Sequence, residues 1–358
     1  MDLSLDESQQ ILVDTFSEML EKECPTTHVR DCEETGFSSV LWNQYCELGA
    51  NIMGLPEANE GLEMSLLDLG LVANESGKAL APVPFIEVAV AGRLLAKLSP
   101  DDTLLGALTE GKPAVSLAIP RPNAIFGTSG GRALIPFGTL ADAAIALDGD
   151  TLFVAENGDA RRSGHVRDLG SSALAHWRLD RDADSRVLAS GPDATDAMRR
   201  ADAEWKLLAG FWLTGIARRA LAIGSDYARE RIQFGVPIGG FQAIAHPLAE
   251  NAIRIDGAEL LCWEAAWADT EDPERFEMLA SMAFAWASQT AIRTSDISLH
   301  THGGYGFSTE YDIQMFYRRA RALSSVGGGS QEELQTVAER CFDSDGSGKA
   351  ASLLGGAN

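Results

Sequence analysis

One stretch, Arg231-Ile-Gln-Phe-Gly-Val-Pro-Ile-Gly-Gly-Phe-Gln-Ala-Ile-Ala-His246, carries the strongest structural signal in this chain. It begins where a long apolar segment ends, passes through Gly and Pro, and runs into a second apolar segment. This order predicts a helix, a tight turn and another helix. Arg231 stands at the corner, where its guanidinium offers a fixed charge and forked donors suited to phosphate oxygens. The simpler alternative is an exposed Arg-Gln pair that ends a helix.

A second motif, His300-Thr-His-Gly-Gly-Tyr-Gly-Phe307, follows downstream. Its glycines, Gly303 and Gly304, permit close approach of the backbone and allow amide groups to face an anion. Alone, a Gly-Gly-x-Gly sequence is weak evidence for a phosphate site. A third glycine run, Val326-Gly-Gly-Gly329, comes next and contains no acidic residue.

The hydrophobic periodicity changes twice along the chain. Helical spacing marks 6–23, 37–48, 66–80 and 85–98, short apolar runs mark strands at 114–119, 143–147 and 152–155, and helical spacing returns at 201–231, 241–267, 276–299, 315–323 and 332–342. The pattern predicts an α+β fold. Its parts are an N-terminal α-helical domain (1–112), a small middle β domain (113–194), a C-terminal four-helix bundle (195–342) and a disordered Gly/Ser/Ala-rich tail (343–358).

Three glycines, Gly210, Gly215 and Gly224, lie inside the longest of these helical segments. Each glycine in a helix interior costs about 1 kcal/mol relative to alanine. We therefore expect other helices to approach this segment closely at the three positions.

Composition limits the class of protein. The net charge of −23 comes with no basic stripe, which argues against nucleic-acid binding. The five cysteines are scattered without a Cys-x-x-Cys pair, which predicts reduced thiols and no metal site. No run approaches the ~18 apolar residues of a membrane span, and the acidic first residues contain no apolar signal core. We expect a cytoplasmic protein that does not associate with membranes.

The two motifs and the α–β–α order together resemble the acyl-CoA dehydrogenase family over nearly the whole chain. The resemblance implies the fold of that family, an FAD cofactor and α,β-dehydrogenation of an acyl-CoA substrate. In that reaction a carboxylate takes the α-proton, and the flavin receives the β-hydride. The cofactor-binding residues that the resemblance implies are Arg231, Gln233, Phe234, Gln242, His300, Gly303, Gly304 and Gln331.

The catalytic base of the family is missing from its usual positions. Of the two places where the family carries its Glu, this chain has Gly327 at one and Trp205 at the other. Glu204 is adjacent, but one residue along a helix turns a side chain by ~100°, so it would serve only after a bulge or a shifted alignment. Two further departures are His300 in place of a usual Gln and Arg319 in place of a usual Asp. The middle domain also lacks the family segment that lines the flavin ring and the substrate.

The chain therefore resembles the non-catalytic subunit of heterotetrameric (α2β2) bacterial acyl-CoA dehydrogenases of steroid or bile-acid side-chain degradation. The resemblance implies a subunit that lends its C-terminal domain to the FAD site of a catalytic partner. The complex would oxidise a bulky, steroid-derived acyl-CoA and pass electrons to an electron-transfer flavoprotein. Two alternatives stay open. One is a self-sufficient homotetramer with a relocated base such as Glu204, and the other is a flavin-free scaffold or binding protein on the same fold.

Overall fold

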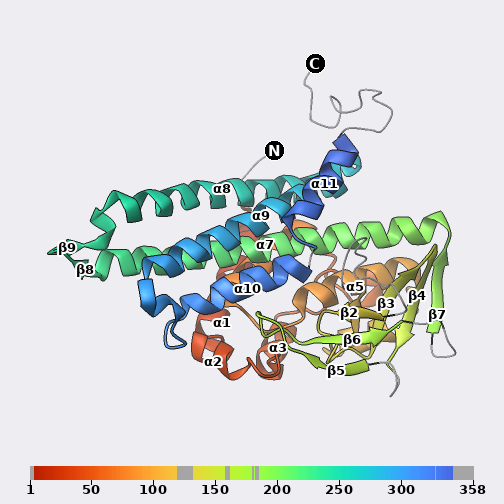
Figure 1. Cartoon of the computed structure of the whole chain (residues 1–358). Helices are drawn as coiled ribbons and strands as arrows, with labels where there is room; N and C mark the ends of the chain where they lie inside the picture. The colour runs from red at the N-terminus through yellow and green to blue at the C-terminus, as the bar shows by residue number, and fades with distance from the viewer. Residues whose placement is uncertain are drawn as a thin grey trace.

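The computed structural model of the chain describes residues 4–118, 132–157, 162–179, 181, 185–326 and 328–341. Two sequence predictions, the one on Gly327 and the one on the tail 343–358, lie outside the described residues. Helices come first, a region of short strands follows, and long helices complete the chain (Figure 1). The predicted α+β fold class is confirmed.

The N-terminal part is a cluster of helices with a shared apolar core. Asp6 and Gln9 form a reciprocal capping box at the start of α1, and Ser65 and Asp68 do the same for α4. The elements are α1 (Glu7–Glu23), α2 (Thr26–Asp31), α3 (Ser39–Glu47), the 3-10 helix η1 (Glu57–Asn59), α4 (Leu66–Ala79), α5 (Phe85–Leu98) and α6 (Thr103–Thr109). The sequence pattern missed α2 and α6 because each is too short to show a helical period.

Two small sheets form the middle region. Their strands are β1 (Val115–Leu117), β2 (Arg132–Ile135), β3 (Ala143–Asp148), β4 (Thr151–Glu156), β5 (Arg162–Val166), β6 (Leu174–Arg178) and β7 (Ser185–Ser190). The strand orders are β1-β3-β4-β7 and β2-β6-β5. Gly149, with a φ of 61°, makes the two-residue turn between β3 and β4. Phe153 from the first sheet and Trp177 from the second lie in one buried cluster, so the sheets pack face to face.

The C-terminal part is built around α7, a helix of 39 residues. The elements are α7 (Pro192–Glu230), β8 (Ile232–Gln233), β9 (Val236–Pro237), the 3-10 helix η2 (Ile238–Gly240), α8 (Gln242–Glu271), α9 (Pro273–Thr301), the 3-10 helix η3 (Gly303–Phe307), α10 (Ile313–Val326) and α11 (Ser330–Cys341). Figure 1 shows α7, α8 and α9 lying alongside one another, with the β8–β9 hairpin at one end and α11 towards the other. By length and composition α7 could cross a membrane, but 67% of its apolar window is buried inside the protein, which is typical of a core helix.

Close helix packing explains two of the three glycines in α7. A Cβ atom at Gly215 would lie 2.1 Å from the backbone oxygen of Asn74 in α4, and one at Gly224 would lie 2.6 Å from Oγ of Ser298 in α9. The expectation of close helix approach is confirmed at these positions. Gly210 is less constrained, because its Cβ would meet its nearest neighbour at 3.3 Å.

Candidate functional site

The β8–β9 hairpin projects from the end of α7 (Figure 1). Arg231 is the residue at which α7 ends. The turn between the two strands consists of Phe234 and Gly235, both with positive φ, of 54° and 81°. Phe234 is 93% exposed, and its ring meets Phe241 edge-on at 6.1 Å. A bulky residue held at positive φ and turned outward is strained, and such strain is typical of binding sites.

The η3 loop lies beside this hairpin. The guanidinium carbon of Arg231 is 5.8 Å from the centroid of the Tyr305 ring. A Cβ atom on Gly303 or Gly304 would meet nothing within 4 Å, so the backbone there is open to a ligand. Within the described part of the chain Arg231 forms no ion pair, so its charge is available. The structure thus brings together the two motifs that the sequence singled out, and it places His300, exposed in the last turn of α9, next to them.

A cluster of rings anchors η3 to the end of α7. The ring of His302 stacks on Tyr227 at 4.1 Å and meets Tyr311 edge-on at 5.8 Å. Its Nδ1 donates to the backbone oxygen of Ser298 at 2.7 Å, which fixes the tautomer. Burial lowers the pKa of His302, so the ring is neutral at physiological pH and suited to stacking. These contacts hold the glycine loop in a constant position relative to Arg231.

The two glutamines of the first motif lie at the same end of the bundle. Gln242 is the first residue of α8 and is exposed. Gln233 is also exposed, and its side-chain amide donates to the backbone oxygen of Ile232 at 2.8 Å. Both amides can rotate towards a ligand at little cost, because neither is buried.

An apolar stripe runs from this end of the molecule along α8. Ile253, Leu260 and Trp267 are 73%, 48% and 38% exposed, and their spacing of seven places them on one helix face. We call these three residues the α8 stripe. Exposed apolar side chains of the hairpin and of η3 add to it: Ile232, Phe234, Val236, Phe241, Tyr305 and Phe307. Exposed apolar residues gathered in this way are typical of interaction sites.

Gln331 lies away from these residues. It is exposed near the start of α11, and α11 packs beside the beginning of α9, where Arg340 pairs with Glu277 at 2.6 Å. At 1.5 Å per residue, the length of α9 between Glu277 and His300 is about 35 Å. The structure therefore does not bring Gln331 to the Arg231 end of the bundle.

The second family position for the base, Trp205, is in the core. Its side chain is fully buried, and its ring lies 5.9 Å from that of Phe284. Its indole nitrogen donates to Oε1 of Glu87 in α5 at 3.2 Å. A buried indole fills the space that a carboxylate would need at this position.

Glu204, the substitute base considered from the sequence, is held by two arginines. Its carboxylate pairs with Arg93 at 2.8 Å and with Arg200 at 2.9 Å, at the wall of a cavity of about 350 Å³. Burial raises the pKa of Glu204, but the two guanidinium groups outweigh burial and hold the pKa below its usual value. A carboxylate stabilised in its charged form is a weak proton acceptor, so the geometry argues against this role.

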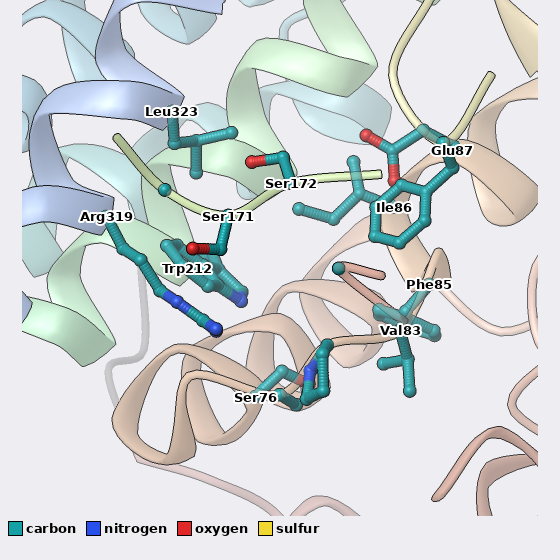
Figure 2. A pocket seen from close by; sticks show the side chains of 15 residues that line it. Ser76, Val83, Phe85, Ile86, Glu87, Ser171, Ser172, Trp212, Arg319 and Leu323 are labelled. Carbon is teal, nitrogen blue, oxygen red and sulfur yellow. The ribbon is translucent and has the colours of Figure 1, made fainter. Parts of the chain in front are cut away.

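Glu87 is an acid that the sequence reasoning did not consider. It is fully buried in α5, and burial raises its pKa to about 7. Besides contacting Trp205, it lines a second cavity, shown in Figure 2. Its position in an apolar helix gave no sequence signal beyond a charged residue within the run Phe85-Ile-Glu-Val-Ala.

Comparison with known proteins places this geometry in a family. Residues 6–100 match the family described as "Acyl-CoA dehydrogenase, N-terminal domain", and residues 196–342 match "Acyl-CoA dehydrogenase, C-terminal domain". Together the two matches cover more than half of the chain. The chain belongs to the acyl-CoA dehydrogenase family, and the resemblance seen in the sequence is confirmed.

Individual relatives agree over nearly the full length. The chain is 26% identical over 345 residues to acyl-CoA dehydrogenase IpdE2 of Mycolicibacterium smegmatis, covering 94% of this chain and 100% of the relative. The crystal structure of the ChsE4-ChsE5 complex from Mycobacterium tuberculosis superposes with a TM-score of 0.86 at 25% identity, covering 96% of this chain and 100% of that one. A Tcur3481-Tcur3483 steroid ACAD variant superposes with a TM-score of 0.83 at 24% identity, covering 93% and 97%, and shares the fold.

Acyl-CoA dehydrogenases are FAD-binding flavoproteins, so FAD is the cofactor that belongs to this family. The Arg231 end of the bundle fits part of that cofactor. An unpaired guanidinium, an open Gly303-Gly304 backbone and two exposed glutamine amides form a donor set suited to a pyrophosphate.

Proposed function

We propose that this chain is the non-catalytic subunit of a heteromeric acyl-CoA dehydrogenase and completes the FAD site of a catalytic partner. One observation carries the proposal. The donors that fit a pyrophosphate are gathered on an exposed end with an apolar surface, whereas a buried Trp205 occupies one of the family's base positions. Groups that would act across an interface are present, and the described family position for the base, Trp205, carries no acid.

Each retained group has a role in this proposal. Arg231 binds the flavin pyrophosphate, with Gln233 and Gln242 as neutral donors beside it and the Gly303-Gly304 amides facing the phosphate oxygens. Phe234 forms an apolar wall, and its exposure means that only a partner can cover it. FAD, when bound, accepts the β-hydride of the substrate. The partner supplies the carboxylate that takes the α-proton. His300 adds a donor near the phosphates. Gln331, which lies beside the other end of α9, is too far from Arg231 to contact the same FAD and is given no role at this site.

Relatives suggest the assembly and the substrate. The ChsE4-ChsE5 structure is a complex of two chains, and the Tcur3481-Tcur3483 protein is a steroid ACAD. By analogy we assign an α2β2 assembly and a bulky, steroid-derived acyl-CoA to the complex that contains this chain. An electron-transfer flavoprotein is the proposed acceptor and the cytoplasm the proposed location. We also propose that the domain boundaries lie at 112/113 and 194/195.

A specific observation favours a second candidate, a self-sufficient dehydrogenase. Glu87 is a buried carboxyl with a pKa raised to about 7, in contact with Trp205. That pKa suits a general base near neutral pH better than the lowered pKa of Glu204. In this reading Glu87, rather than Glu204, would take the α-proton.

The visible spectrum separates these candidates. The full chain is produced alone and together with a candidate catalytic acyl-CoA dehydrogenase subunit from the same organism, and each product is mixed with acyl-CoA thioesters of different bulk. We expect flavin absorbance and substrate bleaching only in the co-produced complex. Bleaching by the chain alone would support the self-sufficient enzyme, and loss of that bleaching in Glu87→Gln would assign the base. A flavin-free complex would instead support a scaffold.

A further inference from the structure

A cavity of about 90 Å³ lies where the three parts of the chain meet (Figure 2). The α4–α5 junction, the β5–β6 loop, α7 and α10 each contribute to its walls. These walls are mainly apolar, with Val83, Phe85, Ile86, Phe137 and Leu323 among them. None of the lining residues belongs to the hairpin or to η3, so this is a separate place from the Arg231 end of the bundle.

Arg319 of α10 brings a charge into this cavity. Its side chain is 7% exposed, and one guanidinium nitrogen, Nη1, donates to the backbone oxygen of Leu80. The other, Nη2, has no hydrogen-bond partner within the described part of the chain. Burial lowers the pKa of Arg319 to about 10, so the guanidinium is charged at neutral pH. A buried charged donor left without an acceptor is unfavourable, which favours the binding of an anion.

The acidic residues near Arg319 are engaged elsewhere. Glu33 pairs with Arg318, and the carboxylate of Asp168 accepts hydrogen bonds from Ser172 at 2.7 and 3.1 Å. Neither acid forms an ion pair with Arg319. Among the described residues, the buried cation at the cavity therefore has no carboxylate paired with it.

Two more donors line the same cavity. The indole nitrogen of Trp212 and the hydroxyl of Ser171 have no hydrogen-bond partner among the residues that the structure describes. Figure 2 shows both side chains at the end of the cavity that holds Arg319, whereas Glu87 lies at the other side. The cavity therefore has a donor-rich end, and the rest of its wall is apolar apart from Glu87, Ser76 and Ser172.

We propose that this cavity is a binding site for a small monocarboxylate with an apolar body. The carboxylate accepts hydrogen bonds from Nη2 of Arg319, Nε1 of Trp212 and Oγ of Ser171. The hydrocarbon part packs against Phe85, Ile86 and their apolar neighbours. Because the ligand touches the N-terminal helices, the β region and the bundle at once, its binding stabilises their relative arrangement. Binding at this site requires no flavin, so it can be measured on the chain with or without its cofactor; Glu87, the base of the second candidate function, lies at the far side of the cavity and is not a contact of the carboxylate.

Benzoate is a suitable probe, with benzamide as its uncharged isostere and sulfate as an anion without an apolar body. The full chain, in complex with its partner if the complex is what purifies, is titrated with each compound by calorimetry. We expect benzoate to bind and to raise the unfolding temperature, and we expect benzamide and sulfate to bind at least ten times more weakly. Absence of benzoate binding at millimolar concentration overturns the proposal. Equal binding of sulfate replaces it with a general anion site.

Three variants locate the binding. Trp212→Phe keeps the aromatic packing and removes one neutral donor, so the dissociation constant for benzoate should rise about 2- to 12-fold. Arg319→Lys keeps the charge but loses the forked donor geometry, and the loss should be about 10-fold or more. Arg321→Met, which removes a charge from the same helix outside the cavity, should bind as the parent does. If Arg319→Lys does not fold, unchanged binding by Trp212→Phe still counts against the site.

Discussion

At the scale of single residues, burial and pairing decide which charged side chains are available for chemistry. Glu204 is buried but neutralised by Arg93 and Arg200, so its charge serves the packing of α5 against α7. Arg231 is exposed and forms no ion pair within the described residues, so its charge is available to a ligand. Their positions in the sequence do not reveal this difference, because both residues are simply charges in or beside a helix.

The first prediction concerns Arg231. Arg231→Gln in the co-produced complex should weaken FAD retention about 10- to 150-fold, because charge-assisted hydrogen bonds to the pyrophosphate are lost. The flavin-to-protein ratio after dialysis, from absorbance, measures this effect. Arg229→Gln is the matched control, since Arg229 is an exposed arginine two residues away that pairs with Asp226 at 3.0 Å. Equal FAD content in both variants would remove Arg231 from the cofactor site.

The second prediction uses the raised pKa of Glu87. Because its pKa rises from 4.5 in the unfolded chain to about 7 in the fold, the native state binds more protons between these values. The unfavourable contribution of Glu87 to stability is therefore absent below about pH 4.5, grows as the pH rises and is complete above about pH 7. At 1.36 kcal/mol per pKa unit it is of the order of 3 kcal/mol.

Glu87→Gln keeps an acceptor for the Trp205 indole and removes this titration. The free energy of unfolding of the variant should therefore equal that of the parent at pH 4 and exceed it at pH 8, as measured by urea denaturation at both values. A difference that does not change with pH would show that Glu87 does not titrate in this range.

At the scale of elements, α7 organises the molecule. It packs against α4 of the N-terminal part, against strands of the β region and against α8 and α9 of the bundle. Its apolar repeat predicted the part from 201 onward, but the structure begins the helix nine residues earlier, at Pro192. The elements that pack against α7 could not be predicted from the sequence, because an apolar helix surface can pack against any apolar neighbour. The backbone oxygen of Asn74, 2.1 Å from where a Cβ on Gly215 would lie, shows how tightly one partner is placed.

The third prediction follows from this contact. Gly215→Ala should lower the free energy of unfolding by about 3 kcal/mol or more, because the methyl group cannot fit against a backbone atom and α4 must move. Thermal or urea denaturation measures the change. Gly257→Ala in α8 is the control, since its nearest contact would be 3.7 Å, and the better helix propensity of alanine should leave stability equal or up to about 1 kcal/mol higher. Equal effects at both positions would contradict the packing argument.

At the scale of the whole molecule, the distribution of exposed apolar residues indicates assembly. The C-terminal bundle carries exposed apolar residues in two places, the α8 stripe and the end formed by the hairpin and η3, where Arg231 also lies. A partner that covers this surface would meet the pyrophosphate donors at the same time. Assembly and cofactor binding should therefore be lost together when the stripe is made polar.

The fourth prediction tests that coupling. The double variant Ile253→Glu, Leu260→Glu should no longer co-purify with its partner, because two charges would be buried at the interface, and the FAD content should fall in parallel. Sedimentation velocity and flavin absorbance follow both properties. Ile11→Glu changes an equally exposed apolar residue on α1, 59% exposed, and should leave assembly intact. A flavin-loaded complex in the double variant would place the interface elsewhere.

The sequence by itself determined the order of helices and strands, because hydrophobic period and turn residues act locally. It also predicted the family and the Arg231 and Gly303 motifs, whose residues lie close together in the chain. It missed the short helices α2 and α6 and several strands, because an element of only a few residues is too short to show a clear hydrophobic period. Only the tertiary structure decided that Trp205 fills the core, that Glu87 and Arg319 share a cavity, and that Gln331 lies far from Arg231. Those facts depend on contacts between distant segments, and burial, which sets both pKa and packing, exists only when those segments have come together.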